Sequence, residues 1–308
     1  MDLSQTLVVG VSSRALFDME EANAVFEAQG VEAYARYQME HQDDILRPGA
    51  GYPLIKSILN LNQKASGGVR KAEVVIMSRN DPATSLRMFN SIKYYGLDIQ
   101  RAALAGGSSL APYLRAFQVS LFLSAFEADV REALNDGFAA GLIVGVPLDP
   151  MQPIDPPIRF AFDADAVLFS DEAERIYKEK GLESFLQHEA ENARKPLPDG
   201  PFAPLLRTIS VLQSDPHFEK SPVRIAVVTA RNMPAHERVI RTLLAWNVRV
   251  DEAFFMGGVS KTRILEAFHP HIFFDDQDVH TTPASSVVPT AKVVSALTSP
   301  LPAPVRQP

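Results

Sequence analysis

The sequence contains no cysteine among its 308 residues. Disulfide bonds, thiolate catalysis and cysteine-ligated zinc are therefore excluded. The chain also lacks an uncharged apolar run of the roughly 18 residues that a membrane helix needs. Its first residues, Met1 to Gln5, lack the basic start and apolar core of a signal peptide. We therefore expect a cytoplasmic protein with no membrane partner.

Basic residues are in deficit, with 30 Lys and Arg against 37 Asp and Glu and a net charge of −7. A nucleic-acid binder normally carries a basic surface, so we expect no nucleic-acid partner. A small anionic substrate remains compatible, because a local site can still be positive. The composition, 46% apolar and 22% charged, is typical of a folded protein, and the length favours two domains.

Short apolar runs alternate with longer amphipathic stretches. Helical patterns cover residues 83–95 and 235–246. The apolar runs lie at residues 7–11, 74–77, 142–146, 160–162, 225–228 and 271–274. Such runs separated by helices predict an α/β fold with parallel sheets and helices on both faces. Ligand sites in such folds lie beyond the carboxyl ends of the strands.

The second half of the chain repeats the first. Shifting it back by 151 residues aligns the halves without a gap from Gly30 and Gly181 to Glu127 and Asp278. Five prolines within residues 147–157 predict a linker between the halves. We interpret the chain as two tandem copies of one α/β domain, residues 1–150 and 151–298. Residues 299–308, with four more prolines, are predicted to form a loose tail.

Polar residues follow four predicted strands of the second half. They are Asp163 with Asp165, then Thr229, Lys261, and Asp275 with Asp276. Each has an ordinary alternative, since acidic pairs often cap helices and a lone Thr or Lys is often structural or solvated. The carboxyl ends of parallel strands converge, however, so these residues are expected to share one pocket.

The chemistry of this set favours phosphate. Neighbouring buried carboxylates repel each other and need a cation. Oxygen ligands without cysteine indicate Mg²⁺, which prefers carboxylates and substrate phosphates. The hydroxyl of Thr229 and the ammonium of Lys261 are donors for phosphate oxygens. Together these residues predict Mg²⁺-dependent phosphoryl chemistry.

The order of these residues resembles the haloacid-dehalogenase (HAD) phosphohydrolase superfamily. It does not fit response-regulator receivers, in which the acidic pair comes first. Longer stretches are similar to the cytosolic 5′-nucleotidase I family, and the similarity covers roughly residues 5–292. The stretches that carry it are residues 12–17, 29–32, 162–172, 188–189, 195–197, 228–231 and 269–277.

The resemblance implies an HAD-like Rossmannoid fold with a small helical cap inserted at about residues 170–222. It implies a Mg²⁺-dependent 5′-nucleotidase that hydrolyses nucleoside 5′-monophosphates through an aspartyl-phosphate intermediate. Asp163 would be the nucleophile, and Asp165 would exchange protons with the leaving group and the attacking water. Thr229, Lys261 and the backbone of Ala164 would bind phosphate. The metal ligands would be Asp163, Asp165 through its backbone carbonyl, Asp275 and Asp276.

Two departures from the family pattern stand out. The family usually has glycine between the first two aspartates, where this chain has Ala164. A positive φ would be unfavourable for alanine there. The chain end after the last motif is also not matched. His188, Glu189, Lys195 and Arg231 are additional candidates for substrate contacts, with an ordinary surface role as the alternative for each.

The first copy lacks the acidic set. Val11 and Ser13 are aligned with Asp163 and Asp165, allowing for a one-residue shift, and Ser78 is aligned with Thr229. At the positions of Lys261, Asp275 and Asp276 stand Leu110, Ser124 and Ala125. We expect residues 1–150 to be catalytically dead, and either to brace the second copy or to bind a regulatory nucleotide. Two other functions remain open: a phosphatase for another small phosphate ester, and a non-enzymatic nucleotide sensor.

Overall fold

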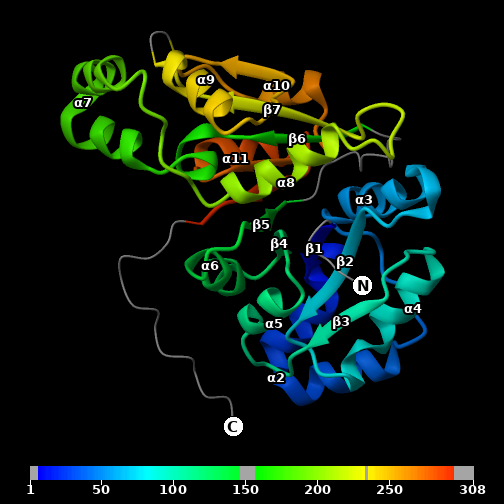
Figure 1. Ribbon diagram of the computed structural model, residues 1–308. Coiled ribbons are helices and arrows are strands. Elements are labelled where there is room, and N and C mark those ends of the chain that lie inside the picture. The colour runs from blue at the N-terminus through cyan, green and yellow to red at the C-terminus, as the bar shows by residue number, and fades with distance from the viewer. Residues whose placement is uncertain (1–5, 146–156, 233–234, 295–308) are drawn as a thin grey trace.

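The computed structural model describes residues 6–145, 157–232 and 235–294 (Figure 1). The predicted proline-rich linker, apart from residue 157, and the predicted tail lie outside these residues. Within them, no helix combines the length and apolarity that crossing a membrane requires.

A single ten-stranded sheet forms the centre of the molecule, in the order β3-β2-β1-β4-β5-β10-β9-β6-β7-β8. Its strands are β1 Leu7–Val11, β2 Ala72–Ser78, β3 Arg101–Leu104, β4 Leu121–Ser124, β5 Ala140–Val144, β6 Ile158–Phe162, β7 Val223–Thr229, β8 Glu252–Phe255, β9 Ile272–Asp275 and β10 Thr290–Lys292. All neighbours are parallel except β5 and β10, which are antiparallel. The α/β class and the parallel strands are confirmed.

The two halves join edge to edge, where the sequence had suggested parallel sheets belonging to separate copies. Thr290 to Lys292 of β10 pair with Val144 to Leu142 of β5. This pairing satisfies backbone groups that would otherwise form two open sheet edges. Outward from the junction, the first half has the order β5-β4-β1-β2-β3 and the second half has the order β10-β9-β6-β7-β8. The second half therefore repeats the strand order of the first.

Helices cover both faces of the sheet (Figure 1). The α-helices are α1 Ser13–Leu16, α2 Glu20–Glu40, α3 Tyr52–Lys64, α4 Leu86–Tyr94, α5 Ala111–Ala116, α6 Glu127–Asn135, α7 Glu172–Glu191, α8 Ala203–Gln213, α9 His236–Ala245, α10 Thr262–Phe268 and α11 Asp278–Ala284. Short 3₁₀ turns, η1 and η2, lie at Ser66–Gly68 and Ala83–Ser85, and a π turn, η3, at Ala164–Leu168.

Successive residues of a strand pack in different hydrophobic cores. Val9 packs in the same core as Leu54 of α3, whereas its neighbour Val8 packs with Leu114 of α5. The core that holds Val9 extends across both halves and includes Phe162 and Leu206 of α8. Side chains of successive strand residues point to opposite faces, so α3 and α5 must cover different sides of the sheet.

Local contacts also repeat at a spacing of 151 residues. Arg87 Nε donates to the Asp44 carbonyl at 3.0 Å, and Arg238 Nε donates to the Lys195 carbonyl at 3.0 Å. Helices α2 and α7 each contain one glycine with positive φ, Gly30 at 80° and Gly181 at 79°. The division into two domains stays a prediction, but the halves share these details.

The predicted cap segment contains two different kinds of helix. Helix α8 packs with its apolar face in the core that also holds Phe160 and Phe162 of β6. Helix α7 instead lies beyond the helical layers at one end of the sheet, at the upper left of Figure 1. Its buried Ala173 and Phe185 form a separate small core with Ala235.

Candidate active site

Three acidic residues meet where β6 and β9 end. Asp163 directly follows β6, and its backbone N–H donates to the Phe274 carbonyl of β9 at 2.8 Å. Asp275 is the last residue of β9, and Asp276 follows it. One carboxylate oxygen from each of Asp163, Asp275 and Asp276 lies within 4.8 Å of the other two. We call these three residues the acidic triad.

Lys261 lies between two members of the acidic triad. Its Nζ donates to Asp163 Oδ1 at 2.5 Å and to Asp275 Oδ2 at 2.6 Å. All three side chains are buried. Burial lowers the pKa of Lys261, but the charges of Asp163 and Asp275 outweigh it and hold that pKa above its usual value. The lysine therefore stays protonated and partly compensates the triad.

One lysine does not compensate three carboxylates. Burial and the charge of Asp275 raise the pKa of Asp163 to about 7, although the charge of Lys261 lowers it. Burial and the charges of Asp163 and Asp275 raise the pKa of Asp276 to about 8. Oδ1 of Asp276 is buried and has no hydrogen-bond partner. An unpaired carboxylate oxygen beside two further acids fits a hard cation such as Mg²⁺, which takes oxygen ligands.

The side chain of Asp165 lies outside the acidic triad. Its two oxygens accept from Arg231, Oδ1 from Nη2 at 2.6 Å and Oδ2 from Nε at 2.8 Å. The remaining guanidinium nitrogen, Nη1, donates to Glu189 Oε2 at 2.5 Å. Burial lowers the pKa of Arg231, but the charges of Asp165 and Glu189 outweigh it and raise that pKa above its usual value.

Thr229 and Ala164 occupy the ends of the neighbouring strands β7 and β6. Thr229 is the last residue of β7, is buried, and accepts from the Arg231 backbone N–H at 3.2 Å through its Oγ1. Ala164 is fully buried directly after Asp163. The positive φ of this turn falls on Ala166, at 58°, and not on Ala164. The alanine therefore carries no backbone strain at the position where the family usually has glycine.

The four candidates for substrate contacts separate into two groups. Arg231 and Glu189 are buried and paired with each other, so in this structure neither is open to a ligand. Lys195 is exposed and His188 is half-buried. Sequence patterns also missed Glu174 of α7, whose Oε1 accepts from Gln277 Nε2 at 3.1 Å beside Asp276. The signal in the sequence was the position of this glutamate in the first turn of α7.

The first half holds an uncharged counterpart of the acidic triad. The Ser12 N–H donates to the Leu123 carbonyl at 2.8 Å, as Asp163 does to Phe274. Ser124 Oγ accepts from the Phe126 N–H at 3.1 Å, as Asp275 Oδ1 accepts from Gln277 at 2.9 Å. Serines at these positions offer no charged ligand to a cation.

The alignment of Val11 with Asp163 was wrong by one residue. In the strand registers, Val11 pairs with Ile76 and Phe162 pairs with Val227, so Val11 corresponds to Phe162 and Ser12 corresponds to Asp163. The extra residue of the second half lies later. Gly49 N–H donates to the Leu16 carbonyl and Gly200 N–H to the Leu168 carbonyl. The glycines differ by 151 positions and the leucines by 152, so the insertion falls within the turn after Asp163.

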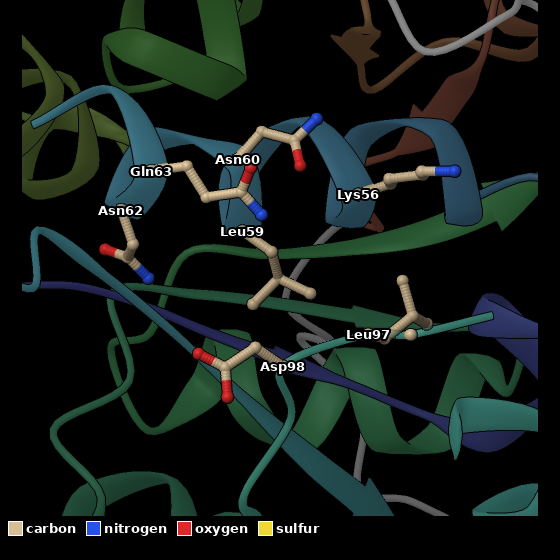
Figure 2. Close-up of a pocket in the computed structure, with 8 residues that line it drawn as sticks. Lys56, Leu59, Asn60, Asn62, Gln63, Leu97 and Asp98 are labelled. Atoms are coloured by element: carbon tan, nitrogen blue, oxygen red, sulfur yellow. The ribbon is translucent and has the colours of Figure 1, made fainter. Parts of the chain in front are cut away.

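A pocket elsewhere on the chain carries no comparable chemistry. Figure 2 shows it between α3 and the segment before β3, with a volume of about 70 Å³. Lys56, Asn62 and Asp98 are among the residues that line it. Asn62 Oδ1 accepts from the backbone N–H groups of Lys71 and Ala72 at 2.8 and 2.9 Å. Asp98 pairs with Arg70. These polar groups serve the fold, and the acidic triad remains the candidate site.

Comparisons with known proteins identify the family of this chain. Residues 1–299 match the model of a protein family described as 5'-nucleotidase. The chain is 35% identical over 283 residues to human "Cytosolic 5'-nucleotidase 1B", which covers 89% of this chain and 46% of the human protein. The chain thus spans about half the length of that relative. Among solved structures, histidinol dehydrogenase from Elizabethkingia anophelis aligns with 80% of this chain and 51% of its own, at 11% identity and a TM-score of 0.25. A likeness that weak carries no argument.

Proposed function

Because the chain belongs to the 5'-nucleotidase family, we propose that it hydrolyses nucleoside 5′-monophosphates to nucleoside and phosphate with Mg²⁺ at the acidic triad. The observation that carries this proposal is the buried group of Asp163, Asp275 and Asp276 with Lys261 between two of them. A binding protein has no need to bury a nucleophile against a metal site. An enzyme that transfers a phosphoryl group needs both.

Asp163 is the proposed nucleophile. Its carboxylate oxygen forms a bond to phosphorus while the bond from phosphorus to the nucleoside O5′ breaks, which leaves an aspartyl-phosphate. Water then attacks the same phosphorus, and the bond to Asp163 breaks. Splitting one displacement into two steps lowers the barrier of each. Lys261 holds the Asp163 carboxylate in place from its position between β8 and α10.

Asp165 is the proposed proton carrier. It gives a proton to the departing O5′ and takes one from the attacking water. Thr229, Lys261 and the backbone N–H of Ala164 are proposed to hold the phosphoryl oxygens. Asp163, Asp275, Asp276 and the backbone carbonyl of Asp165 are the proposed Mg²⁺ ligands. When bound, Mg²⁺ would neutralise the charge that develops on the transferring phosphoryl group.

The two halves are proposed to be copies of one HAD-like domain, of which only the second, residues 151–298, is catalytic. The repeated strand order and the serines at positions 12 and 124 support this. Helix α7 is the proposed cap, because it stands apart from the helical layers. The first half then braces the second through β5 and β10. A regulatory nucleotide bound there is the alternative role.

The first test is phosphate release by the full chain from a panel of nucleoside monophosphates and sugar phosphates, with Mg²⁺ or with EDTA. We expect release from the nucleotides with Mg²⁺ and none with EDTA. Release from sugar phosphates alone would favour a phosphatase for another phosphate ester. Tight nucleotide binding without any release would favour a sensor.

A further inference from the structure

Arg231 links the turn after β6 to helix α7 through buried ion pairs. Its guanidinium donates twice to Asp165 of that turn and once to Glu189 of α7. The side chain of Arg231 is 2% exposed and that of Glu189 is fully buried. The ring of Phe185, also on α7, lies 5.7 Å from the guanidinium carbon. Each guanidinium nitrogen therefore donates to a carboxylate, and these contacts fix the orientation of the group.

A second arginine completes the chain of charges. Glu189 Oε1 accepts from Arg238 Nη1 at 2.8 Å, and Arg238 is itself anchored by Nε to the Lys195 carbonyl. The four side chains carry two negative and two positive charges, so the buried group is balanced. A planar guanidinium that donates in parallel to both oxygens of a carboxylate also fixes the carboxylate plane. Asp165 is accordingly held in one rotamer.

The first half makes the same connection without charge. Asn80 stands at the position of Arg231, Tyr34 at that of Phe185, and Gln38 at that of Glu189, each 151 residues earlier. Asn80 Nδ2 and Gln38 Nε2 both donate to the Tyr34 hydroxyl at 2.9 Å. Neutral amides and a phenol thus tie α2 to the end of β2, just as the ion pairs tie α7 to the end of β7.

This pair of arrangements works as an internal control. Burial of ions is costly, and neutral groups often replace a buried ion pair without loss of stability. The neutral set of the first half is sufficient to attach its helix to the sheet. The contact from Arg87 or Arg238 to a backbone carbonyl, in contrast, is present in both halves. The charged set occurs in the half that has the acidic triad, so the fold alone does not account for it.

We propose that Arg231, oriented by Glu189 of α7, is a positioning residue that aims the Asp165 carboxylate at the water that attacks the aspartyl-phosphate. This inference rests on the proposed function. In that step, an oxygen–phosphorus bond forms from water, the bond from phosphorus to Asp163 breaks, and the proton of the water passes to Asp165. Each contact with the guanidinium uses one lone pair of an Asp165 oxygen, and the fixed carboxylate plane sets the direction of the lone pair that remains. Helix α7 thereby contributes to the geometry of the second step of the reaction.

The test transplants the neutral set into the second half of the full chain. The variant carries Phe185→Tyr, Glu189→Gln and Arg231→Asn together, and Glu189→Gln alone is the milder second variant. Nucleoside and phosphate release from a nucleoside monophosphate are followed in the first turnover with Mg²⁺, and intact mass detects phosphorylated protein. Both steps use Asp165, but O5′ is held by its bond to phosphorus and the water is not, so the second step should slow more than the first. We expect turnover slowed by about 10²-fold, the lower end for a general base. The phosphorylated form should accumulate in both variants, to a smaller extent in Glu189→Gln.

Arg207→Asn is the matched control, because Arg207 makes a similar double contact with Asp199 on the surface. It should show wild-type turnover and no accumulated phosphoprotein. Slowed turnover of the variants without accumulated phosphoprotein would overturn the inference and indicate a structural role. Unchanged turnover would overturn it as well. Wild-type protein that releases nothing from any nucleotide would instead contradict the proposed function, on which the inference depends.

Discussion

Gly200 lies so close to the backbone of Phe169 that no side chain fits between them. A Cβ on Gly200 would come within 2.6 Å of the Val167 carbonyl oxygen and nearer still to that of Phe169. The N–H of Gly200 also donates to the Leu168 carbonyl at 2.9 Å. Because residues 164–168 form the turn directly after Asp163, this contact holds the turn that follows the proposed nucleophile.

Gly200→Ala is expected to reduce both stability and turnover. Overpacking against backbone atoms should lower the free energy of unfolding by about 2 kcal/mol, and displacement of the turn should lower kcat. Gly49→Ala is the matched control, since a Cβ there would lie 2.9 Å from the Phe17 backbone in the first half. It should lower stability but leave the kcat of the folded protein unchanged. Equal losses of kcat in both variants would contradict this account.

Asp163→Asn should abolish phosphate release. The amide keeps the size of the side chain but cannot form the acyl phosphate, so activity should fall by at least about 10⁴-fold, as for other enzymes that lose a nucleophile. A steady-state phosphate assay and an intact-mass search for phosphoprotein measure this directly. Asp136→Asn, which changes an exposed residue of the first half, should behave as wild type. Full activity of Asp163→Asn would exclude Asp163 as the nucleophile.

Lys261→Gln should destabilise the metal-free protein. It removes the one ammonium between Asp163 and Asp275, and breaking a buried ion pair typically costs about 3 kcal/mol or more. Urea denaturation with and without Mg²⁺ measures the effect, and Mg²⁺ should recover part of the loss. Lys292→Gln, which removes a surface pair with Asp278, should change stability little. A Lys261→Gln protein as stable as wild type would contradict the charge arrangement described here.

Stabilisation by Mg²⁺ should increase with pH. Folding raises the pKa of Asp163 from 3.8 to about 7 and that of Asp276 from 3.8 to about 8. The folded protein therefore binds more protons than the unfolded chain between these values. Stability without metal should fall as pH rises from about 4 to about 8. Mg²⁺ competes with those protons, so its effect on Tm should be small at pH 5.5 and larger at pH 8.

Thermal unfolding over this pH range, with Mg²⁺ and with EDTA, makes the comparison. Asp276→Asn removes a carboxyl group whose pKa is raised, so it should reduce the pH dependence of the metal-free protein. A Mg²⁺ effect that is constant with pH would show that these carboxylates do not take up the ion.

Local patterns predicted much of the fold, because β1, β2, β6, β7 and β9 each contain a continuous apolar run. The proximity of Asp163 and Asp275 was also predicted, because the carboxyl ends of parallel strands lie on the same side of a sheet. The pairing of β5 with β10 could not be predicted, since β10 has only three residues and edge pairing leaves no pattern in sequence. Helix α8 was assigned to the cap by its chain position, but its apolar face belongs to the core.

The Asp165–Arg231–Glu189 connection was also beyond sequence reasoning. The sequence indicates Arg231 and Glu189 only as separate candidates for substrate contacts. Whether two such residues meet depends on the path of α7, which bends at Gly181. The offset between Val11 and Ser12 was missed for a similar reason. The strand registers and the hydrogen bonds of Gly49 and Gly200 are needed to place the extra residue in the turn after Asp163.

The antiparallel junction of β5 and β10 has a practical consequence for experiments. Within each half the strands are parallel, and the direction reverses at the junction. The carboxyl ends of the strands, where Ser12 and Asp163 lie, are therefore at opposite ends of the strands in the two halves. A fluorophore or surface tether attached at the end that carries Ser12 would therefore lie at the other end of the strands from Asp163. Immobilised protein could be oriented by the Ser12 end, with the end that carries the acidic triad free in solution.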